Sequence, residues 1–529
     1  MRSILAILMF LLTGATSAAA PAPCRGPTGL YAGSATTPDG VTADVTLNLY
    51  CDGSRFAAQL FTSMGDFDVK AATVAQDHVR IDFDSGAALG TLDLNWDGTT
   101  LSGPVLLADE RGSASLTRKS DPLAPDALTP RLDLTAAQWH EDVRALAEKL
   151  PKLHANAFFS LSRTEFEAEV AALDARGDTA NGDEMFVGLQ QIAKSIGDGH
   201  TGINPPPDRR PMPLEVTRFG EDFRITAVGP GLDRALGARI VKIGGVPIAE
   251  VLTRTMTLTP RGELNELREG NALVYLARGY ALHGLGVIPD RNHAIYTLLD
   301  DSGRTFDIDV RGLKPGEDVK MRSGYSDTAL RFQNPDQPFW CEALAPQSTV
   351  YCAWHSYQDL KAKAAAMFTL IDRIKPEKLV IDMRDNGGGD NTVGYAELVN
   401  PIKMRADLNV RGHLYVLIGP LTFSAAMNNA AQFQDETNAI LVGQTIGERP
   451  NSYQEPRQFR LPNSHLVVRA STLWYAFRKT GPNVVAPDKA IVPSWDDVKN
   501  GRDPVLDWVL EQKVEPIKPR RAMGNMVHP

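Results

Sequence analysis

The fold is decided by the stretch Leu414-Tyr415-Val416-Leu417-Ile418-Gly419-Pro420-Leu421-Thr422-Phe423-Ser424-Ala425-Ala426-Met427-Asn428-Asn429-Ala430. Its apolar beginning, bounded by glycines, is too short for a typical helix and predicts a buried strand. Ser424 then stands where a helix is expected to begin, and the free N–H groups and dipole of a helix N-terminus favour a developing negative charge. Serine is also a preferred N-cap residue. The stretch alone therefore leaves two interpretations of Ser424: a helix cap or an acyl-transfer nucleophile.

The surrounding sequence, over residues 338–515, alternates strands with helices. Leu379–Met383 and Ala439–Val442 are apolar runs of strand length, and Thr392–Val399 and Ser424–Gln434 have helical patterns. Such alternation favours a largely parallel sheet covered by helices. We therefore predict an α/β core over this part of the chain.

A glycine-rich segment follows one of these strands and reads Asp382-Met383-Arg384-Asp385-Asn386-Gly387-Gly388-Gly389. Consecutive glycines let backbone N–H groups approach a ligand closely. A phosphate-binding loop is the competing interpretation, but the GxxxxGK[ST] pattern is missing. In a parallel sheet this loop and Ser424 emerge at the same edge, so we predict that the loop forms an oxyanion hole.

His200 is the candidate base, because a serine needs a neighbouring group to take its proton. It lies in Asp198-Gly199-His200-Thr201-Gly202, after a helix that is expected to stop at Gly197 and before Pro205-Pro206-Pro207. This places it on a loop and not on an apolar face. The alternative is a histidine that interacts with the last carbonyls of the helix. No HExxH or CxxC spacing occurs, so we predict no metal site.

Several of these stretches occur together: Asp198-Gly199-His200-Thr201, Val380 to Gly389, Thr422-Phe423-Ser424-Ala425-Ala426, Val442-Gly443-Gln444-Thr445 and Pro487-Asp488. In this order they resemble the tail-specific, or carboxyl-terminal-processing, serine peptidase family, in its tricorn-like branch with a histidine base. The resemblance implies a crotonase-like ββα core, a peptide or protein substrate and no cofactor. It also implies roles for single residues: Ser424 as nucleophile, His200 as general base, and the N–H groups of Ala425 and of one glycine among Gly387, Gly388 and Gly389 as oxyanion hole.

The chain departs from the family's patterns in two places. Gly447-Glu448-Arg449 stands where the Ser-Lys members carry Gly-Lys-Gly, so a lysine base is not expected. Gly199 replaces the serine that precedes the histidine in the tricorn-like pattern, and the late glutamate is missing near Gly481. A serine–histidine pair without an acid is one alternative, since the acid mainly orients the base. The candidates for an orienting acid are Asp198, Glu448 and Asp488.

These departures keep two other functions open. A catalytically silent peptide-binding protein would retain the fold without the chemistry, and an esterase would use the same serine on another substrate. A fluorophosphonate probe, which reacts with activated serines, separates the silent protein from the enzymes.

The N-terminus predicts a secretory signal peptide over residues 1–20, with Arg2, an apolar run from Ile4 to Leu12 and the small residues Ala18-Ala19-Ala20. That run is too short to span a bilayer, and no later stretch approaches the ~20 residues required. We therefore expect an exported protein, periplasmic or extracellular, without a membrane anchor. The net charge of −9 argues against a nucleic-acid partner.

An exported chain can keep disulfides, and the four cysteines fall into two local pairs. We predict that Cys24 pairs with Cys51 and that Cys341 pairs with Cys352. The alternative for each pair is two free, buried thiols.

Three further regions are expected before the α/β core. Residues 21–120 have short alternating stretches separated by turn signals, which predicts an all-β module, sandwich or barrel. Residues 131–204 predict helices, two of which begin with the capping boxes Thr135/Gln138 and Ser162/Glu165. Residues 211–315 are β-rich and resemble part of a PDZ-type peptide-recognition domain, with an unrelated α/β insertion as the alternative.

Overall fold

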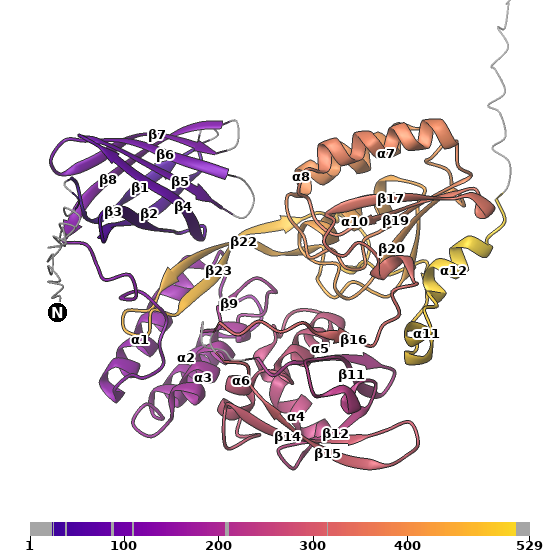
Figure 1. Ribbon diagram of the computed structural model, residues 1–529, viewed down its shortest axis with the longest axis horizontal. Coiled ribbons are helices and arrows are strands. Elements are labelled where there is room, and N and C mark those ends of the chain that lie inside the picture. Colours follow the sequence, from indigo (N-terminus) through magenta and orange to yellow (C-terminus); the bar gives the residue numbers. More distant parts are fainter. Residues whose placement is uncertain are drawn as a thin grey trace, which may run out of the picture. The chain divides into compact units, whose positions relative to one another are not determined.

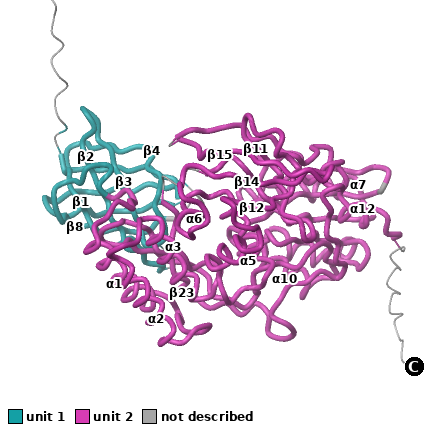
Figure 2. The backbone as a smooth tube through the Cα atoms, turned by 90° about the horizontal axis from the view of Figure 1, so that it is seen from below, with its two compact units in different colours: residues 1–127 teal, residues 128–529 magenta. Residues whose placement is uncertain are grey.

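The structure is a computed structural model that describes Cys24 and residues 26–37, 40–85, 89–107, 110–206, 211–314 and 316–514. The chain divides into two compact units, Met1–Ala127 and Leu128–Pro529, which Figure 2 shows in different colours. The predicted signal peptide lies outside the described residues. Among the helices that are described, none is long and apolar enough to cross a membrane.

The first unit is a closed antiparallel barrel in which β1 pairs with both β2 and β8. β2 is one of the predicted alternating stretches, and its Val45, Leu47 and Leu49 are buried in the barrel interior. Cys24 and Cys51 form a disulfide, as predicted. The strands are β1 (Gly29–Thr36), β2 (Thr42–Asp52), β3 (Arg55–Thr62), β4 (Asp66–Ala75), β5 (His78–Asp84), β6 (Leu89–Trp96), β7 (Thr100–Leu107) and β8 (Glu110–Ser120).

The second unit begins with three helices, α1 (Ala136–Leu153), α2 (Arg163–Asp174) and α3 (Gly182–Ser195). Both predicted capping boxes are confirmed, since each N-cap side chain accepts a backbone N–H and each N3 side chain bonds back to the cap. The chain after α3 turns at Gly197, whose φ of +117° favours glycine. This turn directs the chain into the loop that carries His200.

A mainly antiparallel sheet follows, and within the described residues it has seven strands with the main order β10-β11-β12-β14-β15. Its short strands β13 and β16 pair with β12 and β11, and its buried side chains form a separate core. The strands are β10 (Leu214–Phe219), β11 (Asp222–Val228), β12 (Arg239–Ile243), β13 (Val246–Pro247), β14 (His293–Leu299), β15 (Thr305–Arg311) and β16 (Arg322–Ser323), and the helices are α4 (Ile248–Thr255), α5 (Asn265–Tyr275) and α6 (Gly279–Gly284).

The predicted α/β core contains a sheet with the order β17-β18-β19-β20-β21-β24, in which every pair after β17-β18 is parallel. Side chains of α7 and α10 share one core with one face of this sheet. Those of α12 pack with the other face, and Figure 1 shows these elements together. The elements are β17 (Phe339–Leu344), β18 (Thr349–Trp354), α7 (Leu360–Ile374), β19 (Lys378–Asp382), β20 (Leu414–Ile418), α10 (Ala425–Glu436), β21 (Ile440–Gly443), β24 (Lys489–Ala490), α11 (Trp495–Lys499) and α12 (Pro504–Glu511).

Two details of this core bear on the predictions. Cys341 and Cys352 are opposite each other on β17 and β18 and form the second predicted disulfide. The helix predicted at Thr392–Val399 is instead α8 (Asn391–Gly394), a π-helical turn (Tyr395–Val399) and α9 (Asn400–Met404). Pro401 lacks the N–H that would continue an α-helical bond pattern, which is a physical reason for the irregular turn.

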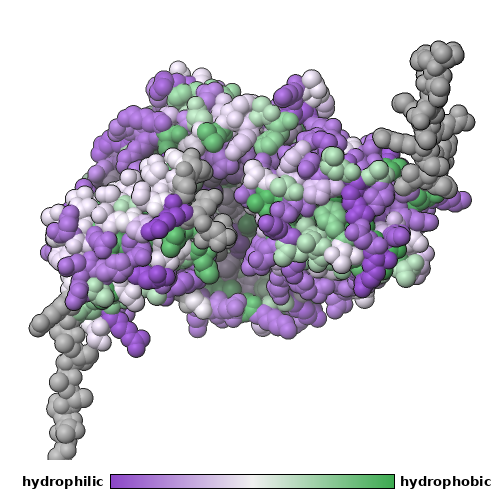
Figure 3. Space-filling view, turned by 90° about the horizontal axis from the view of Figure 1, so that it is seen from above, coloured by the Kyte–Doolittle hydropathy of each residue, from purple (hydrophilic) through white to green (hydrophobic). Residues whose placement is uncertain are grey.

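A long hairpin of β22 (Asn451–Arg460) and β23 (Val467–Ala476) completes the second unit and pairs with the short strand β9 (Gly202–Ile203). The hairpin therefore supports the segment directly after His200. The molecular face in Figure 3 is mostly hydrophilic, with hydrophobic residues in small scattered patches.

Candidate active site

Ser424 occupies the junction between β20 and α10 in a backbone conformation that is rare for a residue with a Cβ. Its φ is +54° and its ψ is −126°, and its side chain makes no capping hydrogen bond to α10. A residue held in such a region costs of order 1–3 kcal/mol and persists only when the surrounding structure fixes it. The helix-cap interpretation of Ser424 therefore lacks the hydrogen bond that would support it.

Hydrogen bonds on both sides fix this junction. The N–H of Phe423 donates to the carbonyl of Asn386 at 3.0 Å, and the Thr422 hydroxyl donates to the carbonyl of Met383 at 2.8 Å. The N–H of Ser424 itself donates to Oε2 of Glu448. The junction is thus tied to the glycine-rich loop on one side and to a buried glutamate on the other.

His200 lies directly beside the serine, with Nε2 at 3.1 Å from Oγ of Ser424. Its ring stacks on the ring of Phe423, with centroids 4.8 Å apart, and its side chain is only 8% exposed. The structure thus brings together two residues that are far apart in the sequence. The distance is that of a nucleophile and its general base.

Asp198 holds the loop of His200 rather than its ring. Oδ1 accepts the N–H groups of His200 at 3.0 Å and Thr201 at 2.8 Å, and Oδ2 lies 3.0 Å from Nε2 of His154. Burial alone would raise the pKa of Asp198, but the hydrogen bond and charge of His154 and the bond from Ser471 lower it to about 2. Asp198 is therefore ionised at neutral pH, and its oxygens contact the backbone of the loop and His154.

Glu448 is the acid that faces the second nitrogen of the His200 ring. Its Oε1 lies 3.5 Å from Nδ1 of His200, and the Glu448 side chain is fully buried. Within the described part of the chain, neither of these two atoms has a hydrogen-bond partner. A small closing movement would satisfy both atoms with one hydrogen bond, and apo active sites often have such long contacts.

Asp488, the third candidate acid, lies apart from this pair. Its Oδ1 accepts a hydrogen bond from Arg411 at 2.9 Å, and its Oδ2 accepts the N–H of Leu441 at 2.9 Å. These contacts stabilise the region of β21 and β24. They give Asp488 a structural explanation that does not involve His200.

Burial dominates the electrostatics of the site. It lowers the pKa of His200 to about 4, although the charge of Asp198 acts in the opposite direction. Burial and the neighbouring Glu263 raise the pKa of Glu448 well above its usual value. The imidazole is therefore neutral at pH 7, which is the state in which it can accept a proton.

Glu263 is a residue that the sequence analysis missed. Its Oε1 accepts the N–H of Gly199 at 3.1 Å and its Oε2 accepts the N–H of Arg449 at 3.1 Å. It thereby joins the loop of His200 to the loop of Glu448, and burial raises its pKa to about 7 despite these bonds. No motif surrounds Glu263 in the sequence, so only its position in the fold could have identified it.

The glycine-rich loop lies against the serine. A Cβ on Gly388 would come within 2.8 Å of Cβ of Ser424 and 3.2 Å of the nitrogen of Ala425, and the φ of Gly388 is +108°. Glycine is required at this close approach. The N–H of Gly388 donates to Oδ1 of Asn386 at 3.0 Å, while a Cβ on Gly387 would have none of the described atoms within 4 Å. Open space thus borders the loop at Gly387.

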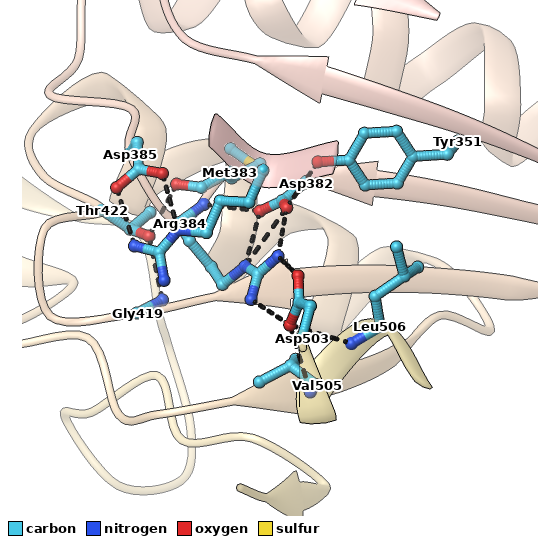
Figure 4. A network of polar contacts seen from close by, with 11 residues as sticks. Tyr351, Asp382, Met383, Arg384, Asp385, Gly419, Thr422, Asp503, Val505 and Leu506 are labelled. Carbon is cyan, nitrogen blue, oxygen red and sulfur yellow. Dashed lines mark hydrogen bonds and ion pairs between the residues drawn. The ribbon is translucent and has the colours of Figure 1, made fainter. Parts of the chain in front are cut away.

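A buried ion network anchors the start of this loop, as Figure 4 shows. Arg384, which is 3% exposed, donates to both carboxylate oxygens of Asp382 and to both of Asp503. Asp503 also caps α12 by accepting two backbone N–H groups, and the Tyr351 hydroxyl donates to Asp382 at 2.8 Å. These bonds hold the C-terminal helix α12 against β19, the strand that leads into the glycine-rich loop.

Fold and site together define a multidomain α/β protein with a serine–histidine pair at the edge of a parallel sheet. No protein-family model matches the chain. No curated protein matches it at a significant level either.

Among solved structures, the chain is similar to mature CPAF complexed with lactacystin, with 12% identity and a TM-score of 0.51 over 71% of this chain and 97% of that chain. It also matches the photosystem II D1 C-terminal processing protease, with 15% identity and a TM-score of 0.33 over 69% of this chain and 98% of that chain. The tricorn protease matches with 12% identity and a TM-score of 0.29 over 88% of this chain and 45% of that chain. At these identities, the likeness to CPAF shows a shared fold.

Proposed function

We propose that the chain is an exported serine peptidase that cleaves peptide bonds through an acyl-enzyme on Ser424. The observation that carries this proposal is the 3.1 Å contact between Oγ of Ser424 and Nε2 of His200. The strained serine, the neutral imidazole and the adjacent glycine loop support the same chemistry. The fold shared with mature CPAF agrees with a tail-specific peptidase of the tricorn-like branch with a crotonase-like core.

The reaction follows from the positions of these groups. Oγ of Ser424 attacks the carbonyl carbon of the substrate while its proton passes to Nε2 of His200. The N–H of Ala425 and one N–H of the Gly387–Gly389 segment stabilise the negative oxygen. Nε2 then gives its proton to the leaving amine, and the C–N bond breaks. Water releases the acyl group by the same steps in reverse order.

Glu448 acts as a positioning residue in this mechanism. In its ionised form Glu448 presents Oε1 as an acceptor at Nδ1 of His200, which selects the tautomer that has its free lone pair on Nε2, toward Ser424. Burial raises the pKa of Glu448 well above its usual value, so this role applies at pH values above that pKa. The other carboxylate oxygen holds the N–H of Ser424. One buried side chain thus orients both the base and the backbone of the nucleophile.

Two other regions complete the proposal. The sheet of residues 211–315 has β10 and β15 at the ends of its main path, and we assign it a PDZ-like role in which a substrate strand adds to a sheet edge. The predicted leader and the two disulfides support export to the periplasm or beyond.

The direct test is a fluorophosphonate probe, followed by peptide mapping of the labelled site. We expect one label per chain, on Ser424, and cleavage of a casein-derived peptide mixture. Absence of labelling in well-folded protein would favour the silent peptide-binding protein. Labelling with hydrolysis of simple esters but of no peptide would favour the esterase.

His200→Ala is expected to lower the rate of Ser424 acylation by about 100-fold or more, as the loss of a general base does. Stopped-flow or time-resolved fluorophosphonate labelling measures this rate directly. His355→Ala is the matched control, because the His355 ring bonds the carbonyl of Gln337 at 2.9 Å and does not belong to the proposed catalytic pair. An acylation rate near that of the wild type in His200→Ala would remove His200 from the mechanism.

The pH dependence of the wild type gives a second readout for the same residue. His200 accepts a proton only when it is neutral, and burial lowers its pKa to about 4. Protonation of the His200 ring should therefore lower kcat/KM only below about pH 5, well under the ~6.5 of an ordinary histidine. A loss of activity that begins at higher pH reports the Glu448 carboxyl, whose pKa burial raises well above its usual value. Near-UV circular dichroism at each pH shows that the fold persists.

Glu448→Gln is expected to lower kcat/KM by about 100-fold, because an amide can present its NH₂ group to Nδ1 and favour the wrong tautomer. Asp488→Asn, which changes another candidate acid in the same way, should stay within about threefold of the wild type. Steady-state kinetics on one peptide substrate compare the two. The opposite order of effects would transfer the orienting role to Asp488.

A further inference from the structure

A cavity of about 410 Å³ lies beside the proposed catalytic pair. Its wall includes Gly199, directly before His200, and Phe423, directly before Ser424. Phe423 also stacks on the His200 ring, so one side chain borders both the cavity and the base. Leu421, on the same loop, is 59% exposed and also lines the cavity. The cavity is thus built partly from the two loops that carry the reacting groups.

The lining combines apolar walls with a cationic, hydrogen-bonding part. Leu258, Leu267 and Val274 are among the apolar residues, whereas Lys194 and Arg278 supply positive charge. Among the described residues that line the cavity, none is acidic. A pocket of this kind favours a ligand group with an apolar stem and a negative end.

Lys194 is held in place for such a contact. Its ammonium group donates one hydrogen bond to the carbonyl of Thr201 at 2.6 Å, which, within the described residues, leaves two of the three hydrogens of a lysine ammonium for other acceptors. Gln190 lies nearby on the same helix, and its own oxygen is fixed by the N–H of Ile203 at 2.7 Å. Burial lowers the pKa of Lys194 to about 8, so the ammonium form still predominates at pH 7.

Asp198 and Glu263 act on Lys194 through their charge, but their carboxylates are hydrogen-bonded to other groups. Asp198 accepts hydrogen bonds from the Ser471 hydroxyl and two backbone N–H groups and contacts His154. Glu263 accepts two backbone N–H groups from other loops. Neither lines the cavity. A carboxylate that enters the cavity would therefore meet a partly desolvated cation, where a charge-assisted hydrogen bond is strong.

We propose that this cavity is a specificity site that binds a carboxylate of the peptide substrate, with Lys194 as its main partner. The carboxylate is that of an acidic side chain of the peptide, and the apolar walls take the rest of that residue. Binding of the free C-terminus is the alternative that the test separates. The assignment rests on the proposed peptidase function. It adds a substrate class, peptides with an acidic group close to the scissile bond.

The test uses a set of fluorescent octapeptides of alanine and leucine, each with one glutamate at a different position. Each acidic peptide has a neutral twin, in which glutamine replaces the glutamate. Every peptide is made with a free and with an amidated C-terminus. At least one acidic peptide should be cleaved about 10- to 100-fold more efficiently than its neutral twin, mainly through KM. A preference that follows the glutamate assigns the site to a side chain, and one that follows the free C-terminus assigns it to the terminal carboxylate.

Lys194→Met should abolish this preference, measured as the ratio of kcat/KM between an acidic peptide and its neutral twin. Lys152→Met, at an exposed lysine of α1 that pairs with Glu148, should keep the preference. If Lys194→Met fails to fold, the comparison between acidic and neutral twins in the wild type still decides. Equal cleavage of all twins, with normal labelling of Ser424, would overturn the cavity assignment and leave the peptidase intact.

Binding separates the two proposals completely. Fluorescence anisotropy of the same peptides with Ser424→Ala needs no hydrolysis, and acidic peptides should bind about tenfold or more tightly than their neutral twins. Tighter binding of acidic peptides, combined with no labelling of the wild-type serine, would support the cavity and reject the peptidase. Identical binding of every pair would reject the cavity.

Discussion

Ser424→Ala is expected to abolish peptide cleavage, with kcat/KM at least about 10⁴-fold below the wild type. The attacking oxygen is lost, because Oγ of Ser424 is the hydroxyl oxygen that lies 3.1 Å from Nε2 of His200. The labelling of the wild type by fluorophosphonate should also disappear. Peptide cleavage followed by mass spectrometry, with an excess of variant enzyme, measures the residual rate.

The fold of this variant should hardly change, which distinguishes a nucleophile from a helix cap. The Ser424 side chain makes no capping bond, so its removal takes no such bond from α10. Ser162→Ala is the matched control, because the Ser162 hydroxyl does cap α2. It should lower the free energy of unfolding by about 1 kcal/mol and leave kcat/KM unchanged. Loss of activity in both variants, or of stability in Ser424→Ala alone, would contradict the assignment.

The features that local sequence could predict are those that depend on a short stretch of chain. The spacing of neighbouring residues predicts the apolar strand β20, the helix that follows it and the capping boxes at Thr135 and Ser162. The rule that parallel strands end at one edge of the sheet then places the glycine loop near Ser424. Those arguments were sufficient for the α/β core and for the choice of candidate residues.

Which of the candidate acids faces the His200 ring was not predictable in this way. Asp198 is nearest to His200 in the sequence, yet its carboxylate faces the backbone of the loop and His154. Glu448 arrives from a loop after β21, and only the three-dimensional structure places it at Nδ1 of His200. Glu263 joins those two loops from a separate segment. Contacts between segments so distant in the chain depend on packing, which local patterns do not encode.

Arg384 is a second case, because its two partners come from different parts of the chain. The residues Asp382-Met383-Arg384 predict a local ion pair, but Asp503 lies 119 residues further along. In the structure Arg384 bridges both carboxylates. Gly419 packs against the arginine side chain, since a Cβ on Gly419 would lie 3.6 Å from Cγ of Arg384. The network therefore connects β19, the loop before Ser424 and α12.

Arg384→Met is expected to lower the free energy of unfolding by about 3–5 kcal/mol, because it leaves two buried carboxylates without their cation. Urea unfolding at pH 7 measures this loss. Arg405→Met is the matched control, since Arg405 pairs with the largely exposed Asp372 and Asp407. Such exposed pairs contribute at most about 1 kcal/mol. Equal losses in the two variants would show that the buried network contributes no more than a surface pair.

The sign of the pH dependence identifies the cause of the Arg384→Met defect. Burial alone would raise the pKa of Asp503, and it is the charge and hydrogen bonds of Arg384 that lower it in the wild type. Without Arg384 the carboxyl group should titrate above its usual range, so protonation relieves the unpaired charge as the pH falls. The stability difference from the wild type should therefore shrink between pH 7 and pH 5.

Because the same arginine anchors the strand that leads to Gly387 and Gly388, kcat should fall at pH 7 while peptide binding to the cavity is retained.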